Sequence, residues 1–223
     1  PVDLTLWKYL WNSSGTGALS PDSSLSFTYS FNLDGTEYYQ HMRGCRPTSG
    51  TLSVSRGMWD QTMTFIAKDI TVPATSTGDG GTPVYQTSET SSSPIVHSDG
   101  GGNPFTWNSV TYGERSFSTT VNRNMAVMAV NGENDITYTK ATDRSITFTA
   151  DVFSGTASNE TAMYTDYEAK NARAASYKFN STGPVTLTYA NSIITDYSHT
   201  HAAGSTDALI ESITARAESC TNL

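Results

Sequence analysis

Residues 44–73 read GCRPTSGTLSVSRGMWDQTMTFIAKDITVP, and this stretch contains two short runs in which every second residue is apolar. The first run has Leu52 and Val54, and the second, after an Arg-Gly break, has Met63 and Phe65. Alternation with a period of two is typical of a strand with one buried and one solvated face. The stretch therefore predicts two antiparallel strands joined by a tight connection.

The same alternation occurs on both sides of this stretch. Residues 25–33 place an apolar group at every second position, Asp34-Gly35 follows as a hairpin turn, and Glu37–Met42 is the expected return strand. Further strands are predicted at 116–121, 136–139, 144–153, 177–179 and 185–189. Leu209–Ala217 fits a helix or a strand, and we expect a closing strand, because the edge of the remaining sheet needs a partner.

One helix is predicted, from Asn159 to about Ala175, where apolar residues fall near helical spacing. The similar stretches 62–67 and 145–150 each centre on a Phe in a Thr-rich strand, which indicates two related half-sheets that bury their phenylalanines against each other. The predicted fold is mainly β, a β-sandwich or partly closed barrel with one covering α-helix. We expect residues 1–223 to form a single domain with a long insertion at about 73–108 that is rich in Gly, Ser and Thr.

The composition argues against several classes of function. The net charge of -8 and the pI near 4.8 are unlike those of a protein that binds nucleic acid through its phosphates. The sequence has no apolar run long enough to span a bilayer, so we expect no membrane association. It also opens with Pro1 and not Met, which suggests that the N-terminus is incomplete.

The sequence shows no motif for a nucleophile, a phosphate-binding loop or a structural metal, so we expect no catalysis and no cofactor. His199 and His201, with Asp196, are weak candidates for a metal site, and a solvated stretch explains them better. The four Trp residues leave a carbohydrate-binding surface open as an alternative, namely Trp7, Trp11, Trp59 and Trp107. Cys45 and Cys220 are either a disulfide or two free thiols.

The order of these segments resembles the tail tube proteins of tailed viruses, over roughly residues 24–217. In that family a Gly-Cys pair precedes a Ser-rich strand and an apolar strand ending in Ala-Lys-Asp; a Gly/Ser-rich insertion and a Pro-Phe pair follow, then a second series of strands. The corresponding segments here are Gly44-Cys45, 50–56, 62–69, Pro104-Phe105, 109–121, 144–150 and 183–191.

The resemblance implies a structural protein of the virion tail. Copies, commonly six, join sheet edges into a ring with a shared inner barrel, and stacked rings form a channel through which DNA passes without specific binding. The implied partners are other copies of the chain and other tail proteins, namely the tape measure, terminator and baseplate proteins and, in tails that have one, the sheath protein. An acidic lumen would let a polyanion slide, and the long insertion would order against the next ring.

Residues expected at contacts between subunits or rings are Thr51, Leu52, Val54, Met63, Phe65, Tyr85, Val96 and Phe105. Two alternatives remain open from the sequence. One is a secreted or cell-surface β-sandwich that binds glycans, and the other is the tube protein of a contractile injection or secretion system.

Overall fold

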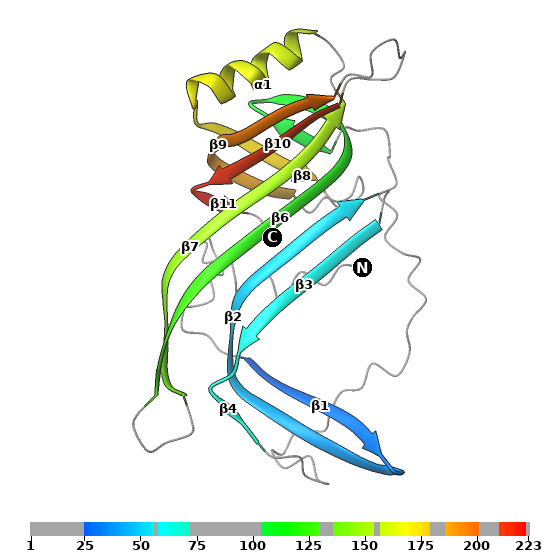
Figure 1. The fold of residues 1–223 in the computed structure, drawn as a ribbon, viewed down its shortest axis with the longest axis vertical. Helices are drawn as coiled ribbons and strands as arrows, with labels where there is room; N and C mark the ends of the chain where they lie inside the picture. Colours follow the sequence, from blue (N-terminus) through cyan, green and yellow to red (C-terminus); the bar gives the residue numbers. More distant parts are fainter. Residues whose placement is uncertain are drawn as a thin grey trace.

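The computed structural model describes residues 25–55, 58–71, 104–129, 136–153, 157–178, 186–200 and 210–221. These residues form eleven strands and one helix (Figure 1). The elements are β1 (Leu25–Leu33), β2 (Thr36–Ser55), β3 (Met58–Ile66), β4 (Asp69–Ile70), β5 (Phe105–Trp107), β6 (Val110–Ala129), β7 (Ile136–Phe153), α1 (Ala157–Ala169), β8 (Arg173–Lys178), β9 (Thr186–Thr200), β10 (Ile210–Ala217) and β11 (Ser219–Thr221).

Six of the strands form a closed circuit of antiparallel pairs. The order runs β6, β5, β8, β9, β10, β7 and then back to β6. A strand inside such a circuit has partners on both sides, so its backbone N–H and C=O groups are satisfied without another chain. We call the part of the molecule enclosed by these six strands the closed region.

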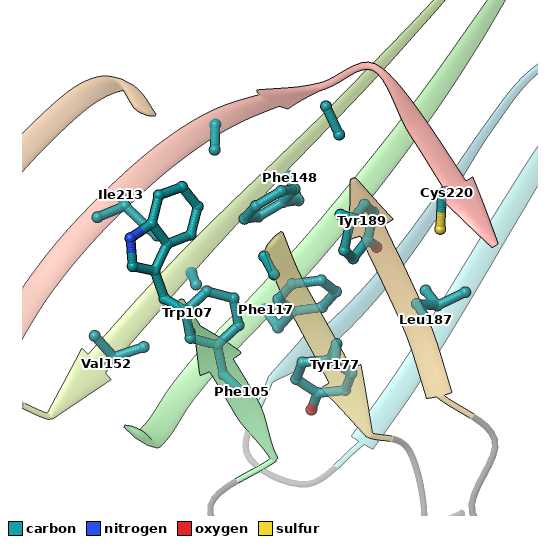
Figure 2. Close-up of a cluster of buried hydrophobic side chains, with 14 of the residues drawn as sticks. Phe105, Trp107, Phe117, Phe148, Val152, Tyr177, Leu187, Tyr189, Ile213 and Cys220 are labelled. Atoms are coloured by element: carbon teal, nitrogen blue, oxygen red, sulfur yellow. The ribbon is translucent and has the colours of Figure 1, made fainter. Parts of the chain in front are cut away.

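Aromatic side chains fill the closed region (Figure 2). Phe117 stacks on Tyr177 with ring centroids 4.0 Å apart, and Phe148 lies 4.6 Å from Tyr189 by the same measure. Phe105 is also fully buried among them. Burying one such ring contributes about 1.5–3 kcal/mol, so these residues supply much of the stability of the fold.

The long sheet extends out of the closed region through β2. Residues 49–55 of β2 pair with β6 on one edge and with β3 on the other. The first half of β2 pairs with β1, and Met42 pairs both with Phe27 of β1 and with Ile70 of β4, so β1 and β4 lie on opposite edges of β2. The β1–β2 hairpin and the far half of the β6–β7 hairpin project from the closed region at the end opposite α1 (Figure 1).

Gly44 lies where β2 passes from its pairing with β3 to the projecting hairpin that it forms with β1. Three steps along β2, from Cys45 to Met42, match two steps along β1, from Leu25 to Phe27, which is a β-bulge. Gly44 has a φ of 60°, and a Cβ at this position would be 2.8 Å from the Cβ of Lys68. Only glycine fits this bend without strain.

The structure confirms a mainly β fold with one helix and corrects several boundaries. The strands predicted at 37–42 and around Leu52 are halves of one strand, β2. The stretches 136–139 and 144–153 likewise join as β7. In each case the strand continues through the interruption in the alternation with a β-bulge, between Met42 and Cys45 in β2 and between Ala141 and Asp143 in β7.

The helix ends at Ala169 and not at Ala175 as predicted. Lys170 has a φ of 52°, which a helix cannot continue through, and Asn171 N–H then donates to the carbonyl oxygen of Asp166 at 3.0 Å. The following residues pair with β5 as β8, for example Ala175 with Trp107. A tertiary pairing therefore overrides the local helical pattern.

The packing decides three other points. The strand from Ile210 is the expected closing strand, because it pairs with β9 on one side and β7 on the other. The two echoed phenylalanines lie apart, since Phe148 is in the core and Phe65 packs edge-on against Phe27. Cys45 and Cys220 are buried free thiols, and only Cys220 belongs to the core cluster.

Candidate assembly interface

The outer edge of β3 has no strand partner within the described part of the chain. Residues 46–55 of β2 pair with its inner edge. The other edge presents a row of backbone N–H and C=O groups, which is a template for pairing with another strand. The edge of β3 is thus one open side of the long sheet.

A second open edge lies on the far side of the same sheet. Residues 146–153 of β7 pair with β10, whereas the described pairing of residues 136–145 is with β6 alone. Counted across the sheet, β3, β2, β6 and residues 145–151 of β7 lie side by side, and we call them the four-strand block. Its open edges are β3 on one side and, further along β7, residues 136–145 on the other (Figure 1).

The projecting hairpins carry exposed apolar side chains. Tyr29 and Leu33 of β1 are 58% and 57% exposed, and Met128 of β6 is 62% exposed. Val127 is beside Met128, and Ile70 of β4 is exposed at the base of the β1–β2 hairpin. Most of the large exposed apolar residues in the described ranges therefore gather at the end of the molecule away from α1.

An aromatic row follows the β1–β2 hairpin. Phe27 meets Phe65 at 4.8 Å between ring centroids, Tyr29 stacks on Phe31 at 5.9 Å, and Phe31 stacks on Tyr38 at 5.8 Å. The contacts between these rings stabilise the hairpin, but the side chain of Tyr29 remains mostly exposed to solvent. The hairpin has the sequence pattern of a half-buried strand without the burial that this pattern predicts.

At the opposite end, a buried carboxylate fixes α1 to the closed region. Asp166 accepts hydrogen bonds from Trp107 Nε1 at 3.0 Å, from Asn171 Nδ2 at 2.9 Å and from Arg173 Nε at 2.9 Å. Burial acts to raise the pKa of Asp166, but these donors and the charge of Arg173 outweigh it and hold the pKa below its ordinary value. The carboxylate stays ionised and anchors the helix.

Buried phenols of the closed region stay neutral. Burial, with smaller contributions from Glu211 and Asp166, raises the pKa of Tyr112 to about 12. Burial raises the pKa of Tyr177 as well, and its hydroxyl donates to Glu114 Oε2 at 2.7 Å. The Tyr177 hydroxyl is therefore satisfied inside the chain, and both neutral phenols serve packing.

The contact residues expected from the sequence fall in different environments. Leu52, Val54 and Phe105 fill the core of the chain itself, and Met63 packs partly against that core. The Thr51 hydroxyl lies 3.0 Å from that of Thr120 on the outer face of the sheet. Phe65 is half-buried against Phe27 as described above, while Tyr85 and Val96 lie outside the described residues.

Sequence reasoning missed Val127 and Met128. The predicted strand stopped at Val121, and the run MAVMAV at 125–130 was not assigned because it lacks alternation. That run is itself the available signal, since a short continuous apolar segment fits a strand that is covered on both faces.

The other sequence candidates gain no support as sites. No group of three or more metal-ligating side chains occurs among the described residues, and His201 lies outside them. Trp107 is buried and bound to Asp166, so it offers no face to a sugar. Trp7 and Trp11 lie outside the described residues, as does the side chain of Trp59. In the described ranges, no helix has the length and apolar character that a membrane span needs.

Comparison with known proteins decides the family. Residues 2–217 match the sequence profile of a family described as phage tail tube protein. The chain belongs to this family. It is accordingly a structural protein of the tail tube, located in the tail of the virion.

Two solved structures have a distant likeness to this tail tube protein. One, from the virion of a native gene transfer agent particle, has 9% identity and a TM-score of 0.38, and the match covers 48% of this chain and 84% of that chain. The other, from the six-fold symmetrised baseplate of the anti-feeding prophage, has 15% identity and a TM-score of 0.39 over 54% of this chain and 89% of that one. No curated protein is significantly similar in sequence.

Proposed function

We propose that this tail tube protein forms rings by joining the open edge of β3 in one copy to residues 136–145 of β7 in the next. The observation that carries the proposal is the pair of open edges on opposite sides of one sheet. β3 lies level with the part of β7 that already pairs with β10. The open segment of β7, to which β3 of the next copy would pair, is therefore offset along the strand direction. Such an offset suits a closed barrel, whose strands tilt against the axis.

Each copy contributes four strands to the shared wall in this arrangement. With six copies, the number that the family resemblance implies, the wall has roughly 24 strands and a backbone diameter on the order of 40 Å. A barrel of that size leaves an open channel, whereas small barrels are filled by their own side chains. The channel serves for the passage of DNA.

The projecting hairpins then connect successive rings. Tyr29 and Leu33 on one hairpin and Val127 and Met128 on the other bury their exposed surface against a copy in the adjacent ring. The part of the predicted insertion before Pro104 is proposed to take part in the same contact, since Phe105–Trp107 form β5 and are buried in the closed region. At the ends of the tube, the remaining tail proteins named above meet the same surfaces. The tube of a contractile injection system would use the same joining of edges.

The test uses two proline variants at neighbouring positions of β3. Thr62 and Met63 are adjacent, so one of their N–H groups points to β2 and the other points to the open edge. Proline at the outward position removes no bond within the chain but blocks pairing with a neighbour. We expect Thr62→Pro and Met63→Pro to differ, with one variant losing thermal stability and the other remaining folded as a monomer.

The readouts are the Tm, the mass in solution and electron micrographs of the purified protein. The wild-type chain is expected to form rings or tubes. Tubes formed by the variant that keeps the wild-type Tm would refute pairing through the β3 edge.

A further inference from the structure

One face of the four-strand block is almost entirely built from hydroxyl side chains. Cross-strand pairing aligns its residues in four rows, and the register defines each row. The rows are Thr64, Ser49, Asn122 and Ser145; Thr62, Thr51, Thr120 and Thr147; Asp60, Ser53, Ser118 and Thr149; and Ser55, Ser116, Asp151 and Ser212. We call this surface the hydroxyl face.

The hydroxyl face lies opposite the core. On β2, β6 and β7 its residues alternate with buried ones such as Leu52, Phe117 and Phe148, and on β3 they alternate with partly buried ones. No member of the four rows is itself buried. The core, the second layer of strands and α1 cover the other side of the sheet (Figures 1 and 2). When such blocks close into a ring, the side covered by the second layer and α1 faces outward, and the hydroxyl face faces the channel.

The charge of this face is low for so large a polar surface. Asp60 and Asp151 are the charged residues in the four rows, and Arg216 extends one row on β10. Both oxygens of Asp151 already accept hydrogen bonds, from Ser116 at 2.7 Å and from Ser212 at 2.5 Å. The middle rows across β2, β6 and β7 hold only Ser and Thr.

We infer that this neutral hydroxyl face lines the channel, and that its lack of charge, and not an acidic surface, lets double-stranded DNA pass without being held. The inference rests on the proposed ring. Lysine or arginine would bind phosphates by releasing counterions, so the four rows, which hold neither, have no such salt-dependent attraction, and Arg216 lies only at their margin on β10. Dense carboxylates would repel one another across paired strands and around the ring. Ser and Thr avoid both effects and hold water at the surface.

The first experiment locates the face with cysteine labelling. Thr149→Cys on β7 is compared with Tyr164→Cys on the exposed side of α1. The two native thiols are buried, so we expect little labelling of the wild-type chain. A maleimide on a large polyethylene glycol is the probe. Both variants are expected to react as free subunits, and only Thr149→Cys is expected to lose its labelling in assembled tubes.

These outcomes separate the inference from the proposed function. Absence of tubes from the wild-type protein counts against the proposed ring. Tubes in which Thr149→Cys reacts as fast as Tyr164→Cys overturn the inference and leave the ring standing.

The second experiment tests the role of neutrality with short linear duplex DNA sedimented with tubes. The double variant Asn122→Arg with Thr149→Arg places cations at two exposed positions, and Asn122→Gln with Thr149→Gln is the uncharged control. We expect the arginine tubes to retain DNA at least about tenfold more tightly at low salt, with the gain lost as salt rises. Equal retention by arginine, glutamine and wild-type tubes would overturn the inference, as would strong retention by the wild type. Tyr164→Arg tubes control for binding to the outer surface.

Discussion

The closed region and the projecting hairpins are built from similar strands but end in opposite states. In the closed region, each strand of the circuit has partners on both sides, and its aromatic rings are buried. In the β1–β2 hairpin, the same alternation of aromatic and hydroxyl residues leaves Tyr29 and Leu33 exposed and the outer edge of β1 without a partner among the described residues. The difference indicates that the closed region stabilises the subunit by itself, whereas in the proposed tube neighbouring copies cover the hairpins.

The largest effect is expected in the closed region. Phe148→Ala removes a fully buried ring that contacts Phe117, Trp107 and Tyr189, and we expect it to lower the free energy of unfolding by about 3–5 kcal/mol. Leu33→Ala on the hairpin is the control. Urea unfolding of the monomeric subunit measures both, and equal costs for the two variants would remove the contrast between the regions.

The next effect concerns the anchor of α1. Asp166→Asn leaves the donors of Trp107, Asn171 and Arg173 with a poorer acceptor. We expect it to lower the free energy of unfolding by about 1–3 kcal/mol at neutral pH. Because the folded pKa of Asp166 lies below its ordinary value of 3.8, its stabilising contribution is full above that pH and is lost as the pH falls through the folded pKa.

The pH dependence supplies the check on that mechanism. Unfolding free energies of the wild type and of Asp166→Asn are expected to converge as the pH drops below 3.8. A difference that stays constant over the whole acid range would show that the ionised carboxylate is not the source of the stability.

A smaller effect is expected at the junction between the two regions. Gly44→Ala forces an L side chain into positive φ and against the Cβ of Lys68, and we expect it to cost about 1–2 kcal/mol. Gly35→Ala, at the turn with a φ of 81° but open space around it, is the matched control and should cost less. Thermal melts of the two variants compare them, and a larger loss at Gly35 would contradict the role given to the bend.

The smallest effect on the subunit is expected from changes on the hairpin itself. Tyr29→Ser combined with Leu33→Ser should change the free energy of unfolding of the monomer by less than about 0.5 kcal/mol per site, since both residues are mostly exposed. The same variant should assemble into shorter tubes because it lacks apolar surface for the next ring. If tubes of this variant are as long as wild-type tubes in electron micrographs, the hairpin does not connect rings.

Sequence patterns predicted the structure correctly where each face of a strand keeps the same environment along its length. The turn at Asp34-Gly35 and the pairing of the strands around Leu52 and Met63 were predicted correctly because period-two alternation and a turn sequence define a hairpin locally. The family was also recognisable from the order of the segments. The end of α1 was not predicted correctly, because the residues after Ala169 pair with β5 in spite of their helical spacing.

The sequence by itself determined that this chain forms alternating strands with one wet face and one dry face, because side-chain direction along a strand depends only on position. Only the tertiary structure decided which dry faces are buried within the chain and which edges stay open. Burial and edge pairing depend on strands far apart in the sequence, such as β7 with β10 and β2 with β6. The same local pattern therefore became a core at Phe148 and an exposed surface at Tyr29.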